Sequence, residues 1–261
     1  MVYWAENKIK RGCMDIWSAE VEFGERDWNI GDGGVVHVNG EAGAGSILAP
    51  GGGGIFRVSG CVRLLGEEDV VRTGTRVVCL GECATGPGAV GCEVRKEGAA
   101  VAWVTLSDKG SRGEREDLSG PRLEELARKA LPVCFTQGFL LPDEKEALRA
   151  LLVDLALFQR FDLVLTTGGT GVGPRDITPE VTLAVIDKRL PGFEHAMAAA
   201  SMPKTPHAMI SRAVAGVLSR CLIVNMPGSV KAVEEIMEAI SPALGHALDK
   251  LRGDSTDCAR A

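Results

Sequence analysis

From residue 99 onward, short apolar runs alternate with segments in which apolar residues recur every three or four positions. The apolar runs have the length of buried strands and lie at 100–106, 134–141, 161–165 and 222–224. The segments between and after them predict helices around 123–127 and at 144–158, 178–186 and 233–251. Strands that alternate with helices pair in parallel through right-handed crossovers. The pattern therefore predicts an α/β fold, with a mostly parallel, Rossmann-like sheet in a three-layer α/β/α arrangement over 99–252.

Two features punctuate this pattern. Leu190-Pro191-Gly192-Phe193-Glu194 is expected to interrupt it, because proline and glycine commonly end regular elements. Pro142 and Asp143 stop the second strand in the same way. Residues 253–261 are expected to form a flexible tail.

Residues 1–95 have a different texture. Short alternating segments, such as 35–38 and 55–58, are separated by glycine clusters, which predicts short strands joined by turns. We therefore expect a small, β-rich, glycine-rich N-terminal unit. The stretch 82–98 contains Gly86, Pro87 and Gly88, and it is the predicted linker to the α/β domain.

A glycine-rich loop joins the third predicted strand to a helix. The strand ends at Thr167, and glycines follow at 168, 169, 171 and 173 around Thr170. Such a backbone can approach a ligand closely and turn its N–H groups inward. Thr178 is expected to be the N-cap of the following helix, whose positive dipole end would face the loop. A tight connection is the alternative, but the four glycines and the Arg175-Asp176 pair favour a phosphate site.

The other loops at the carboxyl ends of the predicted strands should meet this loop at one sheet edge. They are Ser107–Arg112, Pro142-Asp143 and Asn225–Ser229. Asp143 and Asp176 lie on separate loops and could hold Mg²⁺ between phosphate oxygens. Asp176 could instead pair with Arg175, and Asp143 could cap a helix. Capping explains Asp108 and Ser119 as well as ligand binding does, and Pro227-Gly228-Ser229 precedes a second helix N-terminus that suits an anion.

Composition narrows the functional classes. The chain has 261 residues, of which 45% are hydrophobic and 25% charged, as in ordinary globular proteins. A net charge of -6 argues against a general nucleic-acid or membrane surface. Without a spanning run or a signal-like N-terminus, a cytoplasmic protein is expected. The eight cysteines lack Cys-x-x-Cys spacing and the four histidines are scattered, so we expect reduced thiols and no zinc site.

Several ordered motifs between 99 and 252 resemble one family. They are Leu-Thr-Thr-Gly-Gly-Thr-Gly at 165–171, Pro-Arg-Asp-Ile-Thr-Pro-Glu at 174–180, Leu-Pro-Gly-Phe at 190–193, Ile-Ser-Arg at 210–212 and Asn-Met-Pro-Gly-Ser at 225–229. Together they resemble the molybdopterin adenylyltransferase family, the Mog-type domain of molybdenum cofactor biosynthesis that is also the G domain of gephyrin. The resemblance implies transfer of AMP from Mg-ATP to the terminal phosphate of molybdopterin, with release of pyrophosphate.

The resemblance also assigns roles to residues. Asp176 would be a catalytic carboxylate at the metal site, and Asp143 a second one needed for the pterin. The nucleotide phosphate loop would comprise Thr167, Gly168, Gly169, Thr170, Gly171 and Arg175. Substrate contacts would come from Ser107, Asp108, Asn225, Pro227, Gly228 and Ser229. The implied partners are Mg²⁺, ATP, molybdopterin, other copies of the chain in a homotrimer, and other proteins of molybdenum cofactor biosynthesis.

A second resemblance concerns the N-terminal part. Gly-Ile-Phe-Arg-Val at 54–58 and Thr-Gly-Thr-Arg-Val at 73–77 resemble the closing strands of a MOSC domain, a β-barrel module linked to molybdenum cofactor handling and sulfur transfer. Two alternative functions stay open. One is a molybdopterin-binding or carrier module without catalysis, against which the presence of both Asp143 and Asp176 speaks. The other is sulfur transfer centred on the cysteines at 61, 79, 83 and 92.

Overall fold

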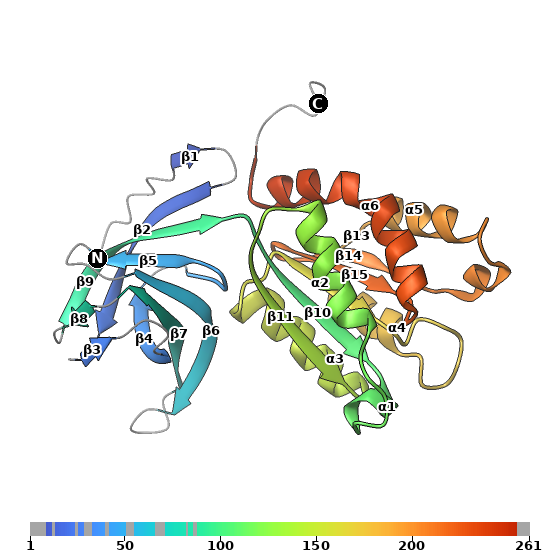
Figure 1. Ribbon diagram of the computed structural model, residues 1–261, viewed down its shortest axis with the longest axis horizontal. Coiled ribbons are helices and arrows are strands. Elements are labelled where there is room, and N and C mark those ends of the chain that lie inside the picture. The colour runs from blue at the N-terminus through green and yellow to red at the C-terminus, as the bar shows by residue number, and fades with distance from the viewer. Residues whose placement is uncertain are drawn as a thin grey trace. The chain divides into compact units, whose positions relative to one another are not determined.

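The protein consists of two compact units, Met1–Gly98 and Ala99–Ala261 (Figure 1). The computed structural model describes residues 9–11, 14–23, 26–28, 33–39, 42–50, 55–65, 71–81, 83–85 and 88–254. Most of the predicted tail, from 255 onward, lies outside the described residues.

The first unit is built on an antiparallel sheet, as the glycine-punctuated pattern predicted. Its strands follow the order β1 (Ile9–Arg11), β2 (Met14–Phe23), β4 (Gly33–Asn39), β7 (Val71–Gly81), β6 (Ile55–Leu65), β5 (Ile47–Pro50) and β9 (Gly88–Glu97). Because β2 pairs with both β4 and β9, the strands from β2 to β9 close into a ring. Alternate side chains fill its interior, among them Leu48, Phe56, Val77, Cys79 and Val94. Two short strands, β3 (Arg26–Trp28) and β8 (Cys83–Thr85), pair separately.

The predicted linker at 82–98 is wrong for most of its length. Strand β9 occupies Gly88–Glu97 and pairs with β2 and β5. Its glycines suggested a flexible connection, but Cys92 and Val94 alternate with exposed neighbours and are buried in the core of the first unit. Period-two burial of this kind marks a strand. The division between the units therefore falls at Gly98, which has a φ of 91°.

The second unit contains a six-stranded sheet in the order β11-β10-β12-β15-β14-β13. As predicted, β10 (Ala99–Leu106), β11 (Val133–Leu141), β12 (Leu163–Thr167) and β15 (Cys221–Met226) are parallel. The edge strands β14 (Ala215–Leu218) and β13 (Lys188–Arg189) run antiparallel and were not predicted. Thr167 pairs with both Thr105 and Met226, so the central strands end at the same level. Their following loops consequently start side by side.

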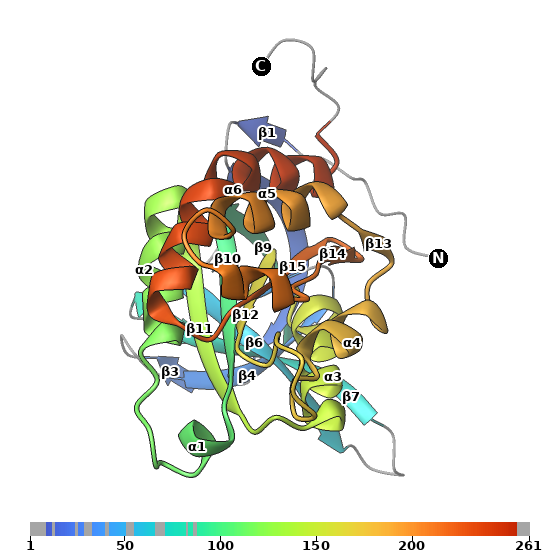
Figure 2. The same cartoon turned by 90° about the vertical axis from the view of Figure 1, so that its right-hand side faces the viewer.

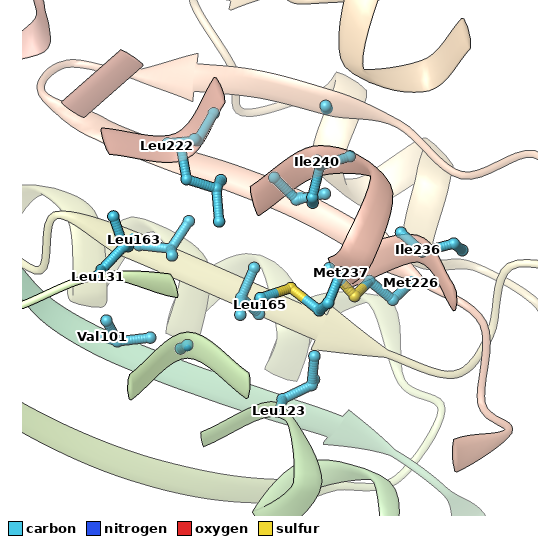
Figure 3. Packing of buried hydrophobic residues seen from close by; sticks show 14 of the residues in the cluster. Val101, Leu123, Leu131, Leu163, Leu165, Leu222, Met226, Ile236, Met237 and Ile240 are labelled. Carbon is cyan, nitrogen blue, oxygen red and sulfur yellow. The ribbon is translucent and has the colours of Figure 1, made fainter. Parts of the chain in front are cut away.

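Helices cover both faces of this sheet (Figures 1 and 2). One face carries α2 (Ser119–Ala130), α5 (Pro191–Ser201) and α6 (Val230–Leu251), and the other carries α3 (Lys145–Val153) and α4 (Thr178–Leu183). Figure 3 shows Leu163 and Leu165 of β12 packed against Leu123 of α2 and against Ile236 and Met237 of α6. The predicted three-layer α/β fold is thus confirmed. In the described part of the chain, no helix has the length and apolar character that a membrane span requires.

Several predicted helix boundaries need correction. Pro191 begins α5 instead of interrupting the pattern, because proline at the first helical position loses no hydrogen bond. Helix α4 ends at Leu183, before the predicted 186. The predicted helix at 144–158 is α3 followed by a π-helical turn, Asp154–Phe158. The loop expected at 107–112 contains a short helix, α1 (Asp108–Ser111).

Candidate functional site

The loops after β10, β11, β12 and β15 are tied together at one edge of the sheet. The backbone N–H of Asp108 donates to Oδ2 of Asp143 at 3.1 Å, and the N–H of Asp143 donates to Oδ1 of Asp108 at 3.1 Å. On the other side, the Thr167 hydroxyl donates to the Pro227 carbonyl at 2.8 Å. The N–H of Gly168 donates to the Met226 carbonyl at 3.1 Å. The structure therefore brings together the four strand ends that the sequence placed at one edge.

The glycine loop adopts a backbone that only glycine accommodates at its start. Gly168 and Gly169 have φ values of 99° and 63°. A Cβ on Gly168 would lie 2.4 Å from the Leu106 carbonyl oxygen, so the loop passes directly against β10. Successive positive-φ residues turn neighbouring N–H groups toward one side, which is the geometry of an anion-binding nest.

Four consecutive N–H groups of this loop have no hydrogen-bond acceptor among the described residues. Among the residues that the structure describes, none accepts a hydrogen bond from the backbone N–H of Gly169, Thr170, Gly171 or Val172. Loop N–H groups that lack a protein acceptor need water or a ligand to satisfy them. Consecutive free N–H groups suit the oxygens of a phosphate.

Two carboxylates face this loop from different directions. Oδ1 of Asp143 lies 3.3 Å from the position that a Cβ on Gly169 would take. Oδ2 of Asp176 accepts the N–H of Gly173 at 2.7 Å and lies 2.8 Å from the corresponding position on Gly171. The side chains proposed from sequence as catalytic thus flank the glycine loop. The hydrogen bond to Gly173 also gives Asp176 a role in shaping the turn.

The environment separates the pKa values of the two aspartates that exchange backbone hydrogen bonds. Burial raises the pKa of Asp143, and the negative charges of Asp108 and Asp176 act in the same direction, against the hydrogen bond from the Asp108 N–H. The pKa of Asp108 is lowered, first by the hydrogen bonds from Arg175 and then by the N–H of Asp143. A cation placed near Asp143 would favour its ionised form.

Arg175 joins three of the loops. Its Nε and Nη2 donate to the two carboxylate oxygens of Asp108 at 3.0 and 2.8 Å, and Nη2 also donates to Glu144 at 3.0 Å. These carboxylates raise the pKa of Arg175 above its ordinary value. The alternative in which Arg175 pairs with Asp176 is not what the structure shows. The phosphate-binding role of Arg175 stays a prediction, since its guanidinium is bound to carboxylates here.

The side chains of Asn225 and Thr167 are fully buried, whereas a side chain that contacts a ligand needs an exposed surface. Asn225 is fully buried, and its Nδ2 donates to the hydroxyls of Thr166 at 3.0 Å and Thr182 at 2.9 Å. The Thr167 hydroxyl is likewise buried against Pro227. Both side chains connect structural elements beneath the loop. Their placement gives no support to direct contact with substrate through these side chains.

The remaining substrate-binding candidates lie at helix starts. Oγ of Ser107 accepts the N–H of Gly110 at 3.0 Å and caps α1, whereas Oγ of Ser229 accepts the N–H of Ala232 at 3.2 Å and caps α6. A Cβ on Gly228 would lie 3.4 Å from Cα of Gly168. The N-terminus of the long helix α6 therefore adjoins the glycine loop, and its dipole favours an anion there.

Sequence reasoning missed two residues that hold the glycine loop. Thr178 was expected to be an N-cap, but it is the first residue of α4, and its hydroxyl donates to the Gly168 carbonyl at 2.9 Å. Arg212 donates to carbonyls of the same loop. Arg212 belonged to a motif that the sequence displayed, but nothing local indicated which atoms it contacts.

Two of the four cysteines considered for sulfur transfer are buried in the first unit. Cys79 and Cys92 are buried in its core, and burial raises the pKa of Cys92 to about 11. Cys61, Cys79, Cys92, Cys134 and Cys221 form no disulfide. No group of histidine, cysteine and acidic side chains among the described residues is arranged to hold a metal ion by itself. Sulfur transfer by Cys79 or Cys92 is not favoured, because a thiolate is the reactive form.

Comparison with known proteins identifies the second unit. A model of the family described as "Probable molybdopterin binding domain" matches residues 102–246, more than half of the chain. The chain belongs to this family. The molybdopterin adenylyltransferase of Helicobacter pylori strain J99 is 39% identical over 156 residues, which cover 59% of this chain and 88% of the relative. Gephyrin of Dictyostelium discoideum is 36% identical over 163 residues, covering 59% of this chain and 23% of that protein.

Solved structures agree with this assignment to the molybdopterin-binding family. The crystal structure of the molybdopterin biosynthesis enzyme MoaB from Thermus thermophilus superposes with a TM-score of 0.55 and 41% identity, covering 60% of this chain and 98% of that chain. The family match contains all four loops of the site. The family resemblance seen in the sequence is therefore confirmed.

Proposed function

We propose that the molybdopterin-binding domain transfers AMP from ATP to the terminal phosphate of molybdopterin and releases pyrophosphate. The observation that supports this most directly is the glycine loop, whose N–H groups from Gly169 to Val172 have no acceptor among the described residues. Carboxylates on two loops flank it. The relatives named molybdopterin adenylyltransferase share the domain at 39% identity. An anion site beside carboxylates suits a nucleotide that binds with a divalent cation.

The donor set beside the glycine loop fits Mg²⁺. Mg²⁺ usually takes one or two protein carboxylates and completes its shell with phosphate oxygens and water. Asp176 and Asp143 supply such carboxylates, and Asp143 would gain a compensating charge for its burial. We propose Asp176 as the principal metal-binding residue and Asp143 as the second carboxylate. When bound, the ion would neutralise phosphate charge that develops during transfer.

The side chains and backbone of the site can carry this reaction by positioning. The loop N–H groups would hold phosphate oxygens of ATP, and the N-terminus of α6 at Ser229 would favour the negative charge of the pterin phosphate. An oxygen of that phosphate attacks the α-phosphorus, while the bond from the α-phosphorus to the bridging oxygen breaks and pyrophosphate leaves. No protein nucleophile is needed, because alignment of two anionic groups is the main barrier.

The assembly and location follow as further parts of the proposal. The family resemblance seen in the sequence supports a homotrimer that works with other proteins of molybdenum cofactor biosynthesis. Light scattering on the purified chain tests the trimer, and a monomer would contradict it. We propose a cytoplasmic location, which fits cysteines such as Cys79 and Cys92 that form no disulfide, because a reducing compartment keeps thiols reduced.

The activity is tested by pyrophosphate release from the intact chain with Mg-ATP and molybdopterin. Asp176→Asn should reduce the rate by at least about 100-fold, because the variant keeps the shape of the side chain but removes its charge. Asp249→Asn, on the exposed surface of α6, is the matched control and should release pyrophosphate at the wild-type rate. An Asp176→Asn variant as active as the control would contradict the assignment.

A further inference from the structure

Four successive carbonyl groups of the glycine loop, from Gly168 to Gly171, accept hydrogen bonds from either Thr178 or Arg212. The Thr178 hydroxyl donates to the Gly168 carbonyl at 2.9 Å, and the Thr178 N–H donates to the Gly169 carbonyl at 3.1 Å. The next two carbonyls are held by one residue. The N–H of Arg212 donates to the Thr170 carbonyl at 3.0 Å, and its Nε donates to the Gly171 carbonyl at 2.7 Å.

The hydrogen bonds to these carbonyls also determine the direction of the N–H groups on the opposite side of the loop. The loop contains no cis peptide bond, and in a trans peptide the carbonyl of one residue points away from the N–H of the next. Fixing the Thr170 and Gly171 carbonyls toward Arg212 therefore points the N–H groups of Gly171 and Val172 away from it. These N–H groups are among those without an acceptor in the described residues.

Arg212 also fixes the far end of the loop. Its Nη2 donates to the Asp176 carbonyl at 2.9 Å, and its Nη1 forms an ion pair with Glu180 of α4. The guanidinium thus contacts both ends of the segment from Gly171 to Asp176. The guanidinium presents several donors in a rigid planar fork, so its separate nitrogens reach two carbonyls and a carboxylate at once. A positive charge on the carbonyl side also polarises these peptides and strengthens their N–H groups as donors.

We propose that Arg212 is a positioning residue that holds the glycine loop in its anion-binding conformation from the side opposite the ligand. Its cationic group therefore serves the loop backbone and does not contact a phosphate. The inference rests on the proposed function for the identity of the anion, but the effect of Arg212 on the loop does not depend on that identity.

The first test measures hydrogen–deuterium exchange in the ligand-free intact chain. Arg212→Met should accelerate exchange in the peptide covering 168–178, which contains the hydrogen-bonded N–H groups of Gly173 and Thr178. Arg128→Met is the matched control, since Arg128 also pairs with a glutamate but lies on α2. Exchange in 168–178 that stays at the wild-type rate in Arg212→Met would overturn the proposal.

The second test measures binding of Mg-ATP by calorimetry. Arg212→Met should bind about 10- to 100-fold more weakly, as expected when hydrogen bonds from a charged group cease to hold the site. Arg212→Lys should be nearly as weak, because one ammonium cannot replace the fork. Glu180→Gln, which keeps the bonds to the carbonyls, should stay within about threefold of wild type. If Arg212→Met fails to fold, Arg212→Lys carries the test, because it keeps the positive charge and loses the fork.

The outcomes separate this proposal from the proposed function. Full recovery of affinity in Arg212→Lys, with an effect that disappears at high salt, would mean that Arg212 acts by charge on the ligand and would overturn the proposal. Accelerated exchange in Arg212→Met with unchanged Mg-ATP affinity would also overturn it. If the wild-type chain binds no Mg-ATP while exchange in Arg212→Met rises, the positioning role stands and the nucleotide assignment fails.

Discussion

Replacement of Gly168 by alanine tests the structural basis of the loop. Gly168 has a φ of 99°, which costs a residue with a side chain about 1–3 kcal/mol. The added Cβ would lie 2.4 Å from the Leu106 carbonyl oxygen, a backbone atom that cannot rotate away. Relieving this contact should cost about 1–3 kcal/mol more. We therefore expect Gly168→Ala to lower the free energy of unfolding by about 2–6 kcal/mol.

Thermal unfolding measures this loss directly. For a domain of this size, about 1 kcal/mol corresponds to 2–4 °C, so the melting temperature should fall by roughly 4–24 °C. Affinity for Mg-ATP should fall at least about tenfold, because the loop N–H groups move with the backbone. Gly192→Ala is the matched control: nothing lies within 4 Å of its Cβ position at the start of α5. That control should be neutral or up to about 1 kcal/mol more stable.

The reasoning would be refuted by a Gly168→Ala protein that melts with the wild type and binds Mg-ATP equally well. Such a result would mean that the loop does not pass against β10 at Leu106 as described. A loss of stability with unchanged Mg-ATP affinity would keep the packing but separate the loop from nucleotide binding.

Three further predictions concern charge, thiols and the core. Burial raises the folded-state pKa of Asp143, so ionisation of this carboxyl destabilises the folded state as pH rises through that pKa. The melting temperature of Asp143→Asn relative to wild type should therefore increase between about pH 3 and pH 8. A difference in melting temperature that stays constant over this range would contradict the raised pKa. Native protein treated with a thiol reagent at about pH 8 should leave Cys79 and Cys92 unmodified on peptide mapping, because both are buried, and rapid labelling of Cys92 would be inconsistent with its raised pKa. Leu165→Ala should cost about 2–5 kcal/mol in urea unfolding, since this fully buried side chain fills the core between β12 and α6, and a loss below about 1 kcal/mol would argue against that packing.

The parallel core of the fold could be predicted because its signals are local. Apolar runs marked β10, β11, β12 and β15, and the periodicity of the helices placed both covering layers. The edge strands escaped notice because Ala215–Leu218 and Lys188–Arg189 are too short to show a period. Glycine and proline misled in two places. The glycines at 82–98 predict a linker, whereas most of that stretch is strand β9 with alternate residues buried. Pro191 predicts a break, whereas proline suits the first helical position and begins α5.

The site could be predicted to the level of its loops but not of its contacts. The glycine motif and the positions of the strand ends predict that Asp143 and Asp176 lie at the same sheet edge, near the glycine loop. The partners of Arg175 and Arg212 could not be found this way, because Arg175 contacts a residue 67 positions away and Arg212 one 41 positions away. Such contacts depend on how the loops fold back onto each other. The burial of Asn225 against Thr166 and Thr182 could not be predicted either, because the motif does not show which way its side chain points.

The most direct test of the account follows a labelled phosphate. The intact chain is incubated with molybdopterin, Mg²⁺ and ATP labelled at the α-phosphorus, and the pterin is then separated and analysed. The account predicts label on the pterin in the presence of Mg²⁺, none after chelation, and one pyrophosphate released for each labelled pterin. Tight binding of molybdopterin without transfer of label would contradict it and would leave a binding module in place of an enzyme.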